Sequence, residues 1–499
     1  MVVKMSQKTV DQLQQKLPTS VLTGRKENVI TGMTADSRAV QPGDIFLAIV
    51  GHTVDGHRFI NKAVERGATA VLVSKEVEVP EDVAVLQVED TKEAIKVLAP
   101  YFYDYPANSL RMIGITGTNG KTTTSHIVAH LLEEAGYKVG VIGTVHVLIN
   151  GVSYPVHNTT PDVADLQPIL RKMVDEGVTH CVMEVSSHAL DEERVAGVEY
   201  DTAVFTNLTQ DHLDYHKTFD NYLAAKAKLF EKVGVEGLKS PKGAVINVDD
   251  AYGQEILEKT SAPVLTYGIH KQADLLGTNV KLQSNSMHFT LSYEGKEYDL
   301  PLKITGLFNV YNTLAAIGAS LMEGLTLAHI LKSLESFEAV PGRFELVEEG
   351  QNFAVVVDYA HTPDGLENVL KTARGITDKK VLVVFGCGGD RDATKRPIMG
   401  RIAATYGDRV YVTSDNPRTE NPTSIVEEVA VGVIEGLREE VTYQVIVDRK
   451  EAIYQAIRDA EAGDVVLIAG KGHEDYQILK DKTIHFDDRE VAREALKEK

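Results

Sequence analysis

A short glycine-rich segment constrains this chain more than any other part of its sequence. The apolar run Met112–Ile115 predicts a buried strand, Gly117–Lys121 predicts a loop, and a helical pattern follows over Thr122–Ala135. In that order, backbone N–H groups of the loop and the helix N-terminus can surround a phosphate group. Lys121 would then reach the terminal phosphates of a nucleoside triphosphate, and the Thr122 hydroxyl would face Mg²⁺. Ile115 stands where the common form of this loop has its first glycine, so the loop is a compact variant.

The overall composition excludes several classes of partner. The 72 Asp and Glu residues outnumber the 52 Lys and Arg residues, and the resulting net charge of −20 argues against nucleic acid or an anionic membrane as the main partner. Cys181 and Cys387 lie far apart in apolar runs, which favours buried thiols in a reducing compartment. We find no signal-peptide pattern and no apolar run near the ~18 residues that span a bilayer. We therefore expect a cytoplasmic monomer without membrane insertion.

Alternating strand and helix patterns predict an α/β protein of about three domains for 499 residues. Residues 1–110 form a small N-terminal α/β domain with strands expected near 44–49, 70–73 and 83–88. Residues 111–337 carry the phosphate loop on a parallel sheet, with an antiparallel hairpin expected at about 287–303. Residues 338–499 repeat the alternation as a Rossmann-like domain. Near-continuous apolar strands predict sheets that helices cover on both faces.

Polar side chains follow several expected strands, where open α/β sheets bind ligands. Glu184 ends an apolar strand, and a carboxylate there is a natural Mg²⁺ ligand of a nucleotide site. His212 lies in a segment after another strand that concentrates imidazoles and carboxylates. Asp36-Ser37-Arg38 suits a phosphorylated or sugar ligand, although turn formation explains it almost as well. Periodicity alone gives Lys226 no special role and predicts a solvated lysine on an ordinary helix.

The C-terminal third concentrates such loops at its strand ends. Arginines, carboxylates and glycines recur in Gly342-Arg343-Phe344-Glu345, Asp358–Pro363, Gly386–Asp392, Ser414–Arg418 and Gly470–Glu474. An acidic strand end can accept a hydrogen bond from a ribose hydroxyl, and an arginine can neutralise a phosphate. Two arginines with an Asp and a Glu would also suit a zwitterion. Turn geometry explains the glycines and prolines but does not require Arg391, Arg418 and Glu474.

Together these segments resemble the Mur ligase family, the ATP-dependent amide ligases that build the peptide of peptidoglycan. The resemblance covers nearly the whole chain and rests on Gly117–Thr123, Asn158-Thr159-Thr160-Pro161, Glu184–His188, Tyr222–Phe230, Phe308–Asn312 and Asp358–Pro363. Asp415-Asn416-Pro417-Arg418 is similar to the signature of members that use meso-diaminopimelate. The resemblance therefore implies addition of meso-diaminopimelate to UDP-N-acetylmuramoyl-L-alanyl-D-glutamate (UDP-MurNAc-L-Ala-D-Glu), with ATP as the activating substrate.

The resemblance also implies roles for individual residues. Lys226 matches the lysine that becomes carbamylated and binds magnesium, with Thr122, Glu184 and His212 completing two Mg²⁺ sites. ATP contacts are implied for Gly117, Thr118, Asn119, Gly120, Lys121, Thr122, Thr123, Asn309, Arg343 and Asp358. Contacts to the UDP-muramoyl-dipeptide are implied for Ser37, Asn158, Thr159, Thr160, Ser186, Glu192 and Arg194, with Glu192 standing where some members carry glutamine. Contacts to diaminopimelate are implied for Arg391, Asp415, Asn416, Pro417, Arg418, Gly470 and Glu474.

Three alternatives remain open from the sequence. A folate-polyglutamating ligase shares the phosphate loop and the three-domain plan, but the Asp36–Arg38 and Asp415–Arg418 segments argue against it. A nucleotide-dependent switch would hydrolyse ATP without the muramoyl-dipeptide and would not need an arginine-rich third domain. The same ligase could also use L-lysine, since the preference for diaminopimelate rests on few residues.

Overall fold

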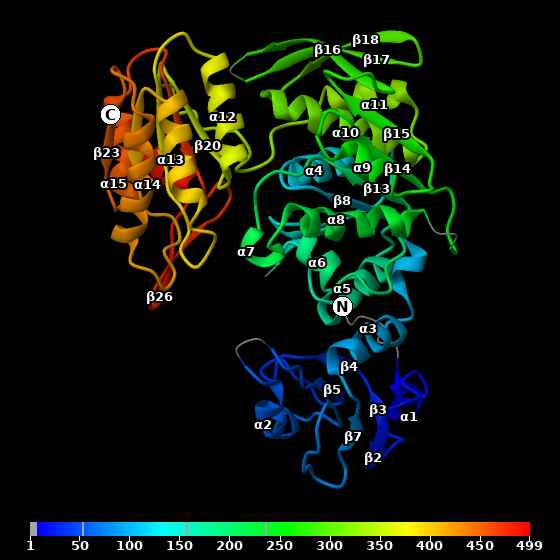
Figure 1. The fold of residues 1–499 in the computed structure, drawn as a ribbon. Coiled ribbons are helices and arrows are strands. Elements are labelled where there is room, and N and C mark those ends of the chain that lie inside the picture. Colours follow the sequence, from blue (N-terminus) through cyan, green and yellow to red (C-terminus); the bar gives the residue numbers. More distant parts are fainter. Residues whose placement is uncertain (1–6, 52–53, 156–157, 235–236, 284) are drawn as a thin grey trace.

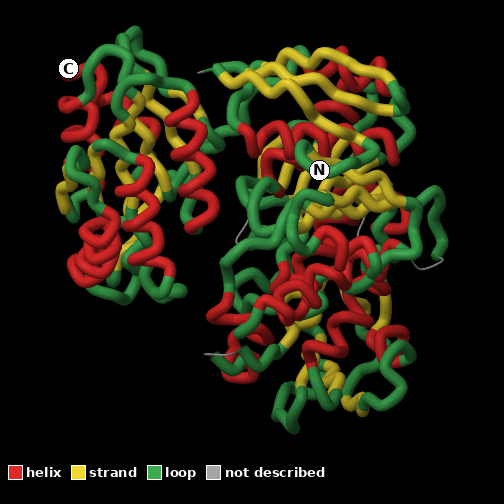
Figure 2. Tube along the Cα trace, turned by 45° about the horizontal axis from the view of Figure 1, so that its top comes forward, coloured by secondary structure: helices red, strands yellow, loops and turns green. Residues whose placement is uncertain are grey.

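The computed structural model describes residues 7–51, 54–155, 158–234, 237–283 and 285–499. It contains three sheets that carry the main α/β units, and two small antiparallel pairs of strands. Figure 1 shows the N-terminal unit (blue) and the C-terminal unit (yellow to red) on different sides of the central unit (green). In Figure 2 the strands of each unit lie among helices, as expected for sheets whose faces helices cover.

The N-terminal unit is a five-stranded sheet with strand order β2-β7-β6-β5-β4. The strands β4 to β7 are parallel, and only β2 is antiparallel. The bounds are β1 Lys8–Thr9, α1 Val10–Gln14, β2 Val21–Thr23, β3 Val29–Ile30, β4 Gly32–Thr34, β5 Asp44–Leu47, α2 Ile60–Glu65, β6 Ala70–Val73, β7 Ala84–Gln87 and α3 Thr91–Phe102. The three expected strands are confirmed. A 3₁₀ turn at Gly56–Phe59 precedes α2, and Asp55 caps it by accepting the His57 N–H.

The central sheet has eleven strands in the order β11-β10-β9-β12-β8-β13-β14-β15-β16-β17-β18. The adjacent strands β9, β12, β8, β13, β14, β15 and β16 are parallel, and antiparallel strands finish both edges. Their bounds are β8 Arg111–Thr116, β9 Val139–Ile142, β10 Val147–Ile149, β11 Val152–Tyr154, β12 His180–Glu184, β13 Thr202–Phe205, β14 Gly243–Asn247, β15 Val264–Gly268, β16 Leu275–Leu282, β17 Met287–Tyr293 and β18 Lys296–Leu302. The expected hairpin is β17–β18. The sequence does not predict the β10–β11 hairpin or the strands β15 and β16.

Helices cover both faces of the central sheet and create two apolar cores. One core contains side chains of α4, α10 and α11, and the other contains those of α5, α6, α8 and α9. Their bounds are α4 Lys121–Glu134, α5 Val163–Asp175, α6 Ser187–Asp191, α7 Leu213–His216, α8 Phe219–Val233, α9 Gly253–Leu257, α10 Leu307–Met322 and α11 Leu327–Leu334. Because both faces are covered, most side chains of the central parallel strands are apolar.

The C-terminal sheet has the order β19-β20-β24-β21-β22-β23 and is parallel except for β19. Helices α12 to α14 pack on one face, and α15 and α16 pack on the other. The bounds are β19 Glu345–Leu346, β20 Ala354–Asp358, α12 Pro363–Gly375, β21 Val381–Phe385, α13 Lys395–Tyr406, β22 Arg409–Val412, α14 Pro422–Gly436, β23 Thr442–Val445, α15 Arg449–Asp459, β24 Val465–Ala469, β25 Tyr476–Leu479, β26 Lys482–His485 and α16 Asp488–Glu498. The loops after β20, β21, β22 and β24 therefore lie together at the carboxyl ends of the parallel strands, as the sequence predicts. None of the helices among the described residues is long and apolar enough to cross a membrane.

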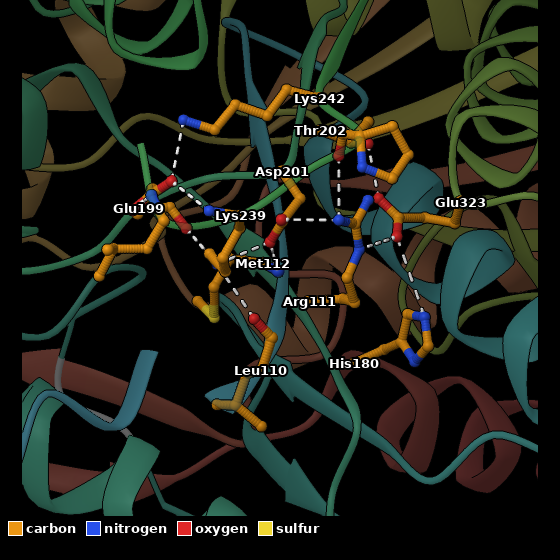
Figure 3. Close-up of polar contacts among 12 residues, drawn as sticks. Leu110, Arg111, Met112, His180, Glu199, Asp201, Thr202, Lys239, Lys242 and Glu323 are labelled. Carbon is orange, nitrogen blue, oxygen red and sulfur yellow. Dashed lines mark hydrogen bonds and ion pairs between the residues drawn. The ribbon is translucent and has the colours of Figure 1, made fainter. Parts of the chain in front are cut away.

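A buried charge network closes the end of the central sheet opposite the phosphate loop (Figure 3). The side chain of Asp201 is 0% exposed, and its two oxygens accept hydrogen bonds from Arg111 Nη1 at 2.8 Å and from Lys239 Nζ at 2.7 Å. Glu323 accepts from Arg111 Nε at 2.7 Å and from the Thr202 hydroxyl at 2.6 Å. Burial and Arg111 lower the pKa of the nearby His180 to about 4. The network therefore joins the starts of β8 and β13 to the end of α10.

Replacing Asp201 with alanine is expected to lower the free energy of unfolding by about 3–5 kcal/mol, because it leaves two cations without their shared buried partner. Urea unfolding of the variant measures this loss. The exposed Asp220→Ala variant in α8 is the control, with an expected loss below about 1 kcal/mol. Equal losses in the two variants would contradict the energetic role of the network.

Candidate functional site

The phosphate loop follows β8, and its two glycines are required by close packing. A Cβ on Gly117 would lie 1.8 Å from Thr206 Oγ1, and one on Gly120, at φ +85°, would lie 2.4 Å from Asn312 Oδ1. The loop is held to the end of β13, since Asn119 N–H donates to Asn207 Oδ1 at 2.8 Å. The loop leads directly into the N-terminus of α4 at Lys121, which gives the strand–loop–helix arrangement that binds phosphate.

Lys121 lies within this loop. Its Nζ donates to the carbonyl oxygens of Gly117 and Thr118, both at 2.8 Å. Burial lowers the pKa of Lys121, and the carboxylate of Glu184 opposes that effect. The half-buried amine of Lys121 therefore lies beside the position where backbone N–H groups would hold a phosphate.

A cavity of about 580 Å³ lies between the central and C-terminal units. Its size is typical of a small-molecule or cofactor site. The lining combines polar side chains from the phosphate loop, the ends of β12 to β14, helix α10 and the start of the C-terminal unit. The predicted residues in this lining are Thr118, Asn119, Gly120, Lys121, Thr122, Thr123, Thr159, Glu184, Ser186, His212, Arg343 and Asp358. Residues separated by more than 200 positions in the sequence thus share one cavity.

Glu184 projects from the end of β12 toward the start of α4. It is 1% exposed, and it accepts hydrogen bonds from Thr122 Oγ1 at 3.0 Å, Thr144 N at 3.0 Å and Thr144 Oγ1 at 2.9 Å. Arg343 Nη2 also donates to Thr122 Oγ1, at 3.0 Å. The hydroxyl and carboxylate that a Mg–nucleotide site requires are therefore adjacent.

Lys226 is buried, which corrects the prediction of a solvated lysine made from periodicity. It is 1% exposed and lies on the apolar face of α8 with Tyr222, Leu223, Leu229, Phe230 and Val233. Its Nζ lies 4.5 Å from the centroid of the Tyr222 ring, and no described residue forms a hydrogen bond or ion pair with it. Burial and the nearby Lys121 lower the pKa of Lys226 well below its usual value. The helical spacing from 222 to 233 could have revealed this position, because it places Lys226 on the core face.

His212 lies at the N-terminus of α7 and belongs to a cluster of aromatic rings. Its ring centroid is 4.7 Å from that of His188, and its Nε2 is 3.2 Å from Asp211 Oδ2. Burial lowers the pKa of His212 to about 3, with Asp211 opposing the effect. The lowered pKa of His212 favours the neutral imidazole, the form that can bind a metal or accept a proton.

The donor set fits magnesium only together with a bound phosphate. Among the described ranges, no group of three or more His, Cys, Asp and Glu side chains is placed to hold a metal ion. Mg²⁺ commonly takes one or two carboxylates and completes its shell with water and substrate phosphates. Thr122 and Glu184 meet that requirement, and a carbamate on Lys226 would add a second anionic ligand.

Most residues predicted to contact the muramoyl-dipeptide lie around the end of β12. Thr159 Oγ1 lies 3.1 Å from Thr144 Oγ1, and Thr160 Oγ1 donates to the Glu184 carbonyl oxygen at 2.8 Å. Ser186 caps α6. Asn158 is exposed at the start of the same segment. Ser37 lies apart from them, in the N-terminal unit after β4, and does not line the cavity.

Glu192 and Arg194 form an ion pair. Glu192 Oε2 lies 2.7 Å from Arg194 Nη2, and Asp162 Oδ1 lies 2.9 Å from Arg194 Nε. A glutamate at position 192 therefore orients the arginine through charge, which a glutamine could do only through a weaker hydrogen bond.

Helix α10 contributes Asn312 to the cavity lining, whereas the predicted residue is Asn309. Asn309 is buried, and its amide donates to the Thr305 carbonyl oxygen at 2.7 Å and its Oδ1 accepts from Asn312 at 2.9 Å. Asn312, one turn further along, lines the cavity. The structure thus places Asn312 between Asn309 and the cavity, and helical spacing from Asn309 is the only sequence signal for it.

Contacts across the cavity join the two units. Asn119 Nδ2 of the phosphate loop donates to Asp364 Oδ2 in the first turn of α12 at 2.6 Å. Burial raises the pKa of Asp364, and the hydrogen bond from Asn119 opposes that effect. Arg343 lies 4.3 Å from the Tyr359 ring centroid, and Asp358 accepts the Phe344 and Ala360 N–H groups. Asp364 was not predicted, since nothing local in its helix distinguishes it.

The second group of strand-end residues forms a separate polar cluster in the C-terminal unit. Arg418, with φ +53°, donates from Nη1 to the Gly389 carbonyl oxygen at 2.8 Å. Asn416 Nδ2 donates to Glu474 Oε2 at 3.0 Å. Gly470 has φ +119°, and a Cβ there would lie 2.7 Å from Asp415 Oδ2. Pro417 continues the segment from Asp415 to Arg418, and Arg391 lies in the neighbouring loop.

Comparison with known proteins agrees with this architecture. The Mur ligase middle domain matches residues 115–320, the Mur ligase glutamate ligase domain matches 342–472, and the Mur ligase family catalytic domain matches 29–103. The UDP-N-acetylmuramoyl-L-alanyl-D-glutamate–2,6-diaminopimelate ligase of Geobacillus thermodenitrificans is 50% identical over 94% of this chain and 95% of its own. The ligase of the same name from Bacillus cereus is 48% identical over 94% of this chain and 95% of its own.

A solved structure extends the similarity to three dimensions. The structure of a UDP-N-acetylmuramoyl-L-alanyl-D-glutamate–2,6-diaminopimelate ligase has a TM-score of 0.67 and 32% identity, and the match covers 98% of this chain and 99% of that one. The domain matches, the full-length relatives and the phosphate loop lead to one conclusion: this chain belongs to the Mur ligase family.

Proposed function

We propose that this chain is the ATP-dependent ligase that joins meso-diaminopimelate to the D-glutamyl γ-carboxylate of UDP-MurNAc-L-Ala-D-Glu. The observation that carries the proposal is the pairing of two sites. A phosphate loop with Glu184 faces the cavity between two units, and a pocket with Arg418, Asn416 and Glu474 lies at the strand ends of the C-terminal unit. The relatives that share the whole chain carry the name of this reaction.

The proposed residues divide between three substrates. The phosphate loop, Asn309, Arg343 and Asp358 hold ATP; Asn312 joins them because it lines the cavity. The residues from Asn158 to Arg194, together with Ser37 in the N-terminal unit, hold the UDP-muramoyl-dipeptide. The loops with Arg391, Asp415–Arg418, Gly470 and Glu474 hold diaminopimelate. We assign these functions to three domains, 1–110, 111–337 and 338–499, in a cytoplasmic monomer.

The reaction proceeds by activating a carboxylate. An oxygen of the D-glutamyl γ-carboxylate attacks the γ-phosphorus of ATP, and the bond between that phosphorus and the β-phosphate oxygen breaks. ADP is released, and the γ-carboxylate becomes an acyl phosphate. The amine of diaminopimelate then attacks the acyl carbon, loses a proton, and inorganic phosphate leaves. Lys121 and Arg343 neutralise charge on the transferring phosphoryl group, since each lies at the phosphate loop. Positioning the amine beside the acyl carbon replaces a slow bimolecular encounter.

Thr122, Glu184, His212 and a carbamate on Lys226 would hold two magnesium ions, which supply further positive charge for phosphoryl transfer when bound. The carbamate forms when the uncharged Lys226 amine attacks carbon dioxide and releases one proton. The burial of Lys226 and the absence of an ion pair to its Nζ among the described residues support this modification.

Phosphate release tests the proposal directly. We expect release from ATP to require UDP-MurNAc-L-Ala-D-Glu and an added amino acid, with strong preference for meso-diaminopimelate over L-lysine. A preference for L-lysine would retain the ligase and reject the role of Arg418. Phosphate release without either co-substrate would instead support a nucleotide-dependent switch.

The contact between Asn119 and Asp364 predicts that the C-terminal unit closes over ATP. Asp364→Ala is expected to raise the KM for ATP about 10-fold, since it removes a hydrogen bond to a charged group. Small-angle scattering should show compaction on adding ATP and the dipeptide, and less compaction in the variant. The exposed Asp378→Ala is the control for the same unit. Unchanged dimensions of the unmodified protein with both substrates would contradict closure.

A further inference from the structure

The polar cluster at the strand ends of the C-terminal unit, which the proposed function makes the amino-acid pocket, contains a buried lysine without an assigned role. Lys471 follows β24, between Gly470 and Gly472, and is 0% exposed. Its Nζ donates to Asn416 Oδ1 at 3.2 Å and to Glu474 Oε2 at 3.0 Å. A fully buried ammonium group costs several kcal/mol of desolvation unless its bonds are well made, so this placement requires an explanation.

The three side chains form a closed ring of hydrogen bonds. Asn416 Nδ2 donates to Glu474 Oε2 at 3.0 Å, so each member of the ring contacts the other two. Asn416 Oδ1 also accepts the Ile478 N–H of β25 at 2.9 Å, which fixes the orientation of the amide. The ring joins the loop after β22 to the loop after β24, two segments that the sheet order separates by β21.

The ring leaves one Glu474 oxygen for a ligand. Oε2 accepts both hydrogen bonds, and no hydrogen bond from the part of the chain that the structure describes reaches Oε1. Lys471 therefore determines which oxygen is available and where it lies. The Tyr476 ring lies beside this pair, with its centroid 5.5 Å from Lys471 Nζ.

We infer that Lys471 is a positioning residue of the amino-acid pocket, which holds Glu474 as an oriented carboxylate for an ammonium group of the incoming diamino acid. The inference rests on the proposed function, because it takes Glu474 and Asn416 as ligands of diaminopimelate. Lys471 itself lies behind these two residues and acts through them.

The charges around Glu474 predict that the effect of removing Lys471 depends on pH. Burial raises the pKa of Glu474, Lys471 opposes that effect, and Asp415 adds to it. Glu474 also interacts electrostatically with Arg449, Tyr359 and Tyr476, and Arg418 acts on Tyr476. Without Lys471 the carboxyl would take up a proton at higher pH and lose its attraction for an ammonium group. Raising the pH would restore the carboxylate.

The test compares Lys471→Met with the unmodified enzyme by steady-state kinetics. We expect the KM for meso-diaminopimelate to rise about 10- to 100-fold, the range for hydrogen bonds to charged groups, and the KM for ATP and the dipeptide to change less than about 3-fold. The ratio of variant to unmodified KM should fall as the pH rises from about 6 to 9. Lys450→Met, an exposed lysine of the same unit paired with Glu494, is the matched control.

If Lys471→Met unfolds, a double variant with Lys471→Met and Glu474→Gln still tests the inference. It removes both charges of the buried pair, so neither charge is left buried without its partner. If Lys471 acts through Glu474, adding Lys471→Met to Glu474→Gln should change the KM for meso-diaminopimelate less than about 3-fold. Lys471→Arg keeps the charge and should restore part of the affinity. Multiplicative effects in the double variant, or an unchanged KM in Lys471→Met, would overturn the inference. Diaminopimelate-independent turnover by the unmodified enzyme would instead overturn the proposed function.

Discussion

Replacing Lys226 with alanine is expected to lower kcat by about 10³-fold or more, the contribution of a lost charged group at a phosphoryl-transfer centre. The structure supports a special role because the lysine is 1% exposed and no described residue pairs with its Nζ. The fold should persist, since no described residue forms an ion pair with Lys226 that the substitution would break. Phosphate release and circular dichroism measure the two effects.

A matched control and a rescue experiment sharpen this prediction. Lys228 lies two residues further along α8, where it pairs with Asp191 at 2.9 Å on a partly exposed face. Lys228→Ala should keep most of the activity. Short carboxylates such as acetate should restore part of the activity of Lys226→Ala, because they can place an anion in the space left by the side chain. Full activity of Lys226→Ala without added carboxylate would exclude the carbamate.

Replacing Arg418 with alanine is expected to remove most of the enzyme's preference for meso-diaminopimelate over L-lysine. A site built to bond a polar substrate group rejects an analogue lacking that group by about 10⁴-fold. The two amino acids differ by one carboxylate, and an arginine binds carboxylates through paired hydrogen bonds. The backbone at Arg418 has φ +53°, and Nη1 is tied to the Gly389 carbonyl oxygen at 2.8 Å. The guanidinium is thus held in place before the substrate arrives.

The ratio of kcat/KM for the two amino acids measures this effect. In Arg418→Ala the ratio should fall by about 10²- to 10³-fold, mainly through weaker use of diaminopimelate. Arg458→Ala, an exposed arginine of α15 that pairs with Glu451, should leave the ratio unchanged. An unchanged ratio of kcat/KM in Arg418→Ala would show that another residue of the pocket discriminates between the two amino acids.

The sequence predicted the parts of the site that depend on local backbone patterns. The strand, glycine loop and helix around Lys121 follow from residues that are neighbours in the chain. The apolar strands and the polar loops after them predicted which ends of the sheets bind ligands, and the sheet orders confirm that these loops gather at one edge. The roles of single residues, including Glu184 and Arg418, remain proposals that the experiments above test.

Only the tertiary structure decided which of these side chains meet. Lys226 was predicted as solvated from periodicity, yet its environment is set by the strands beneath α8 and by Lys121 from another element. The bond between Asn119 and Asp364 joins positions 245 residues apart, and the ring of Lys471, Asn416 and Glu474 joins two separate loops. No pattern among neighbouring residues predicts such contacts, because they depend on how units pack and how side chains become buried together. The sequence by itself thus determined the strands, the loop and the helix that can bind a phosphate, and packing between distant segments determined the charge, orientation and partners of the residues around it.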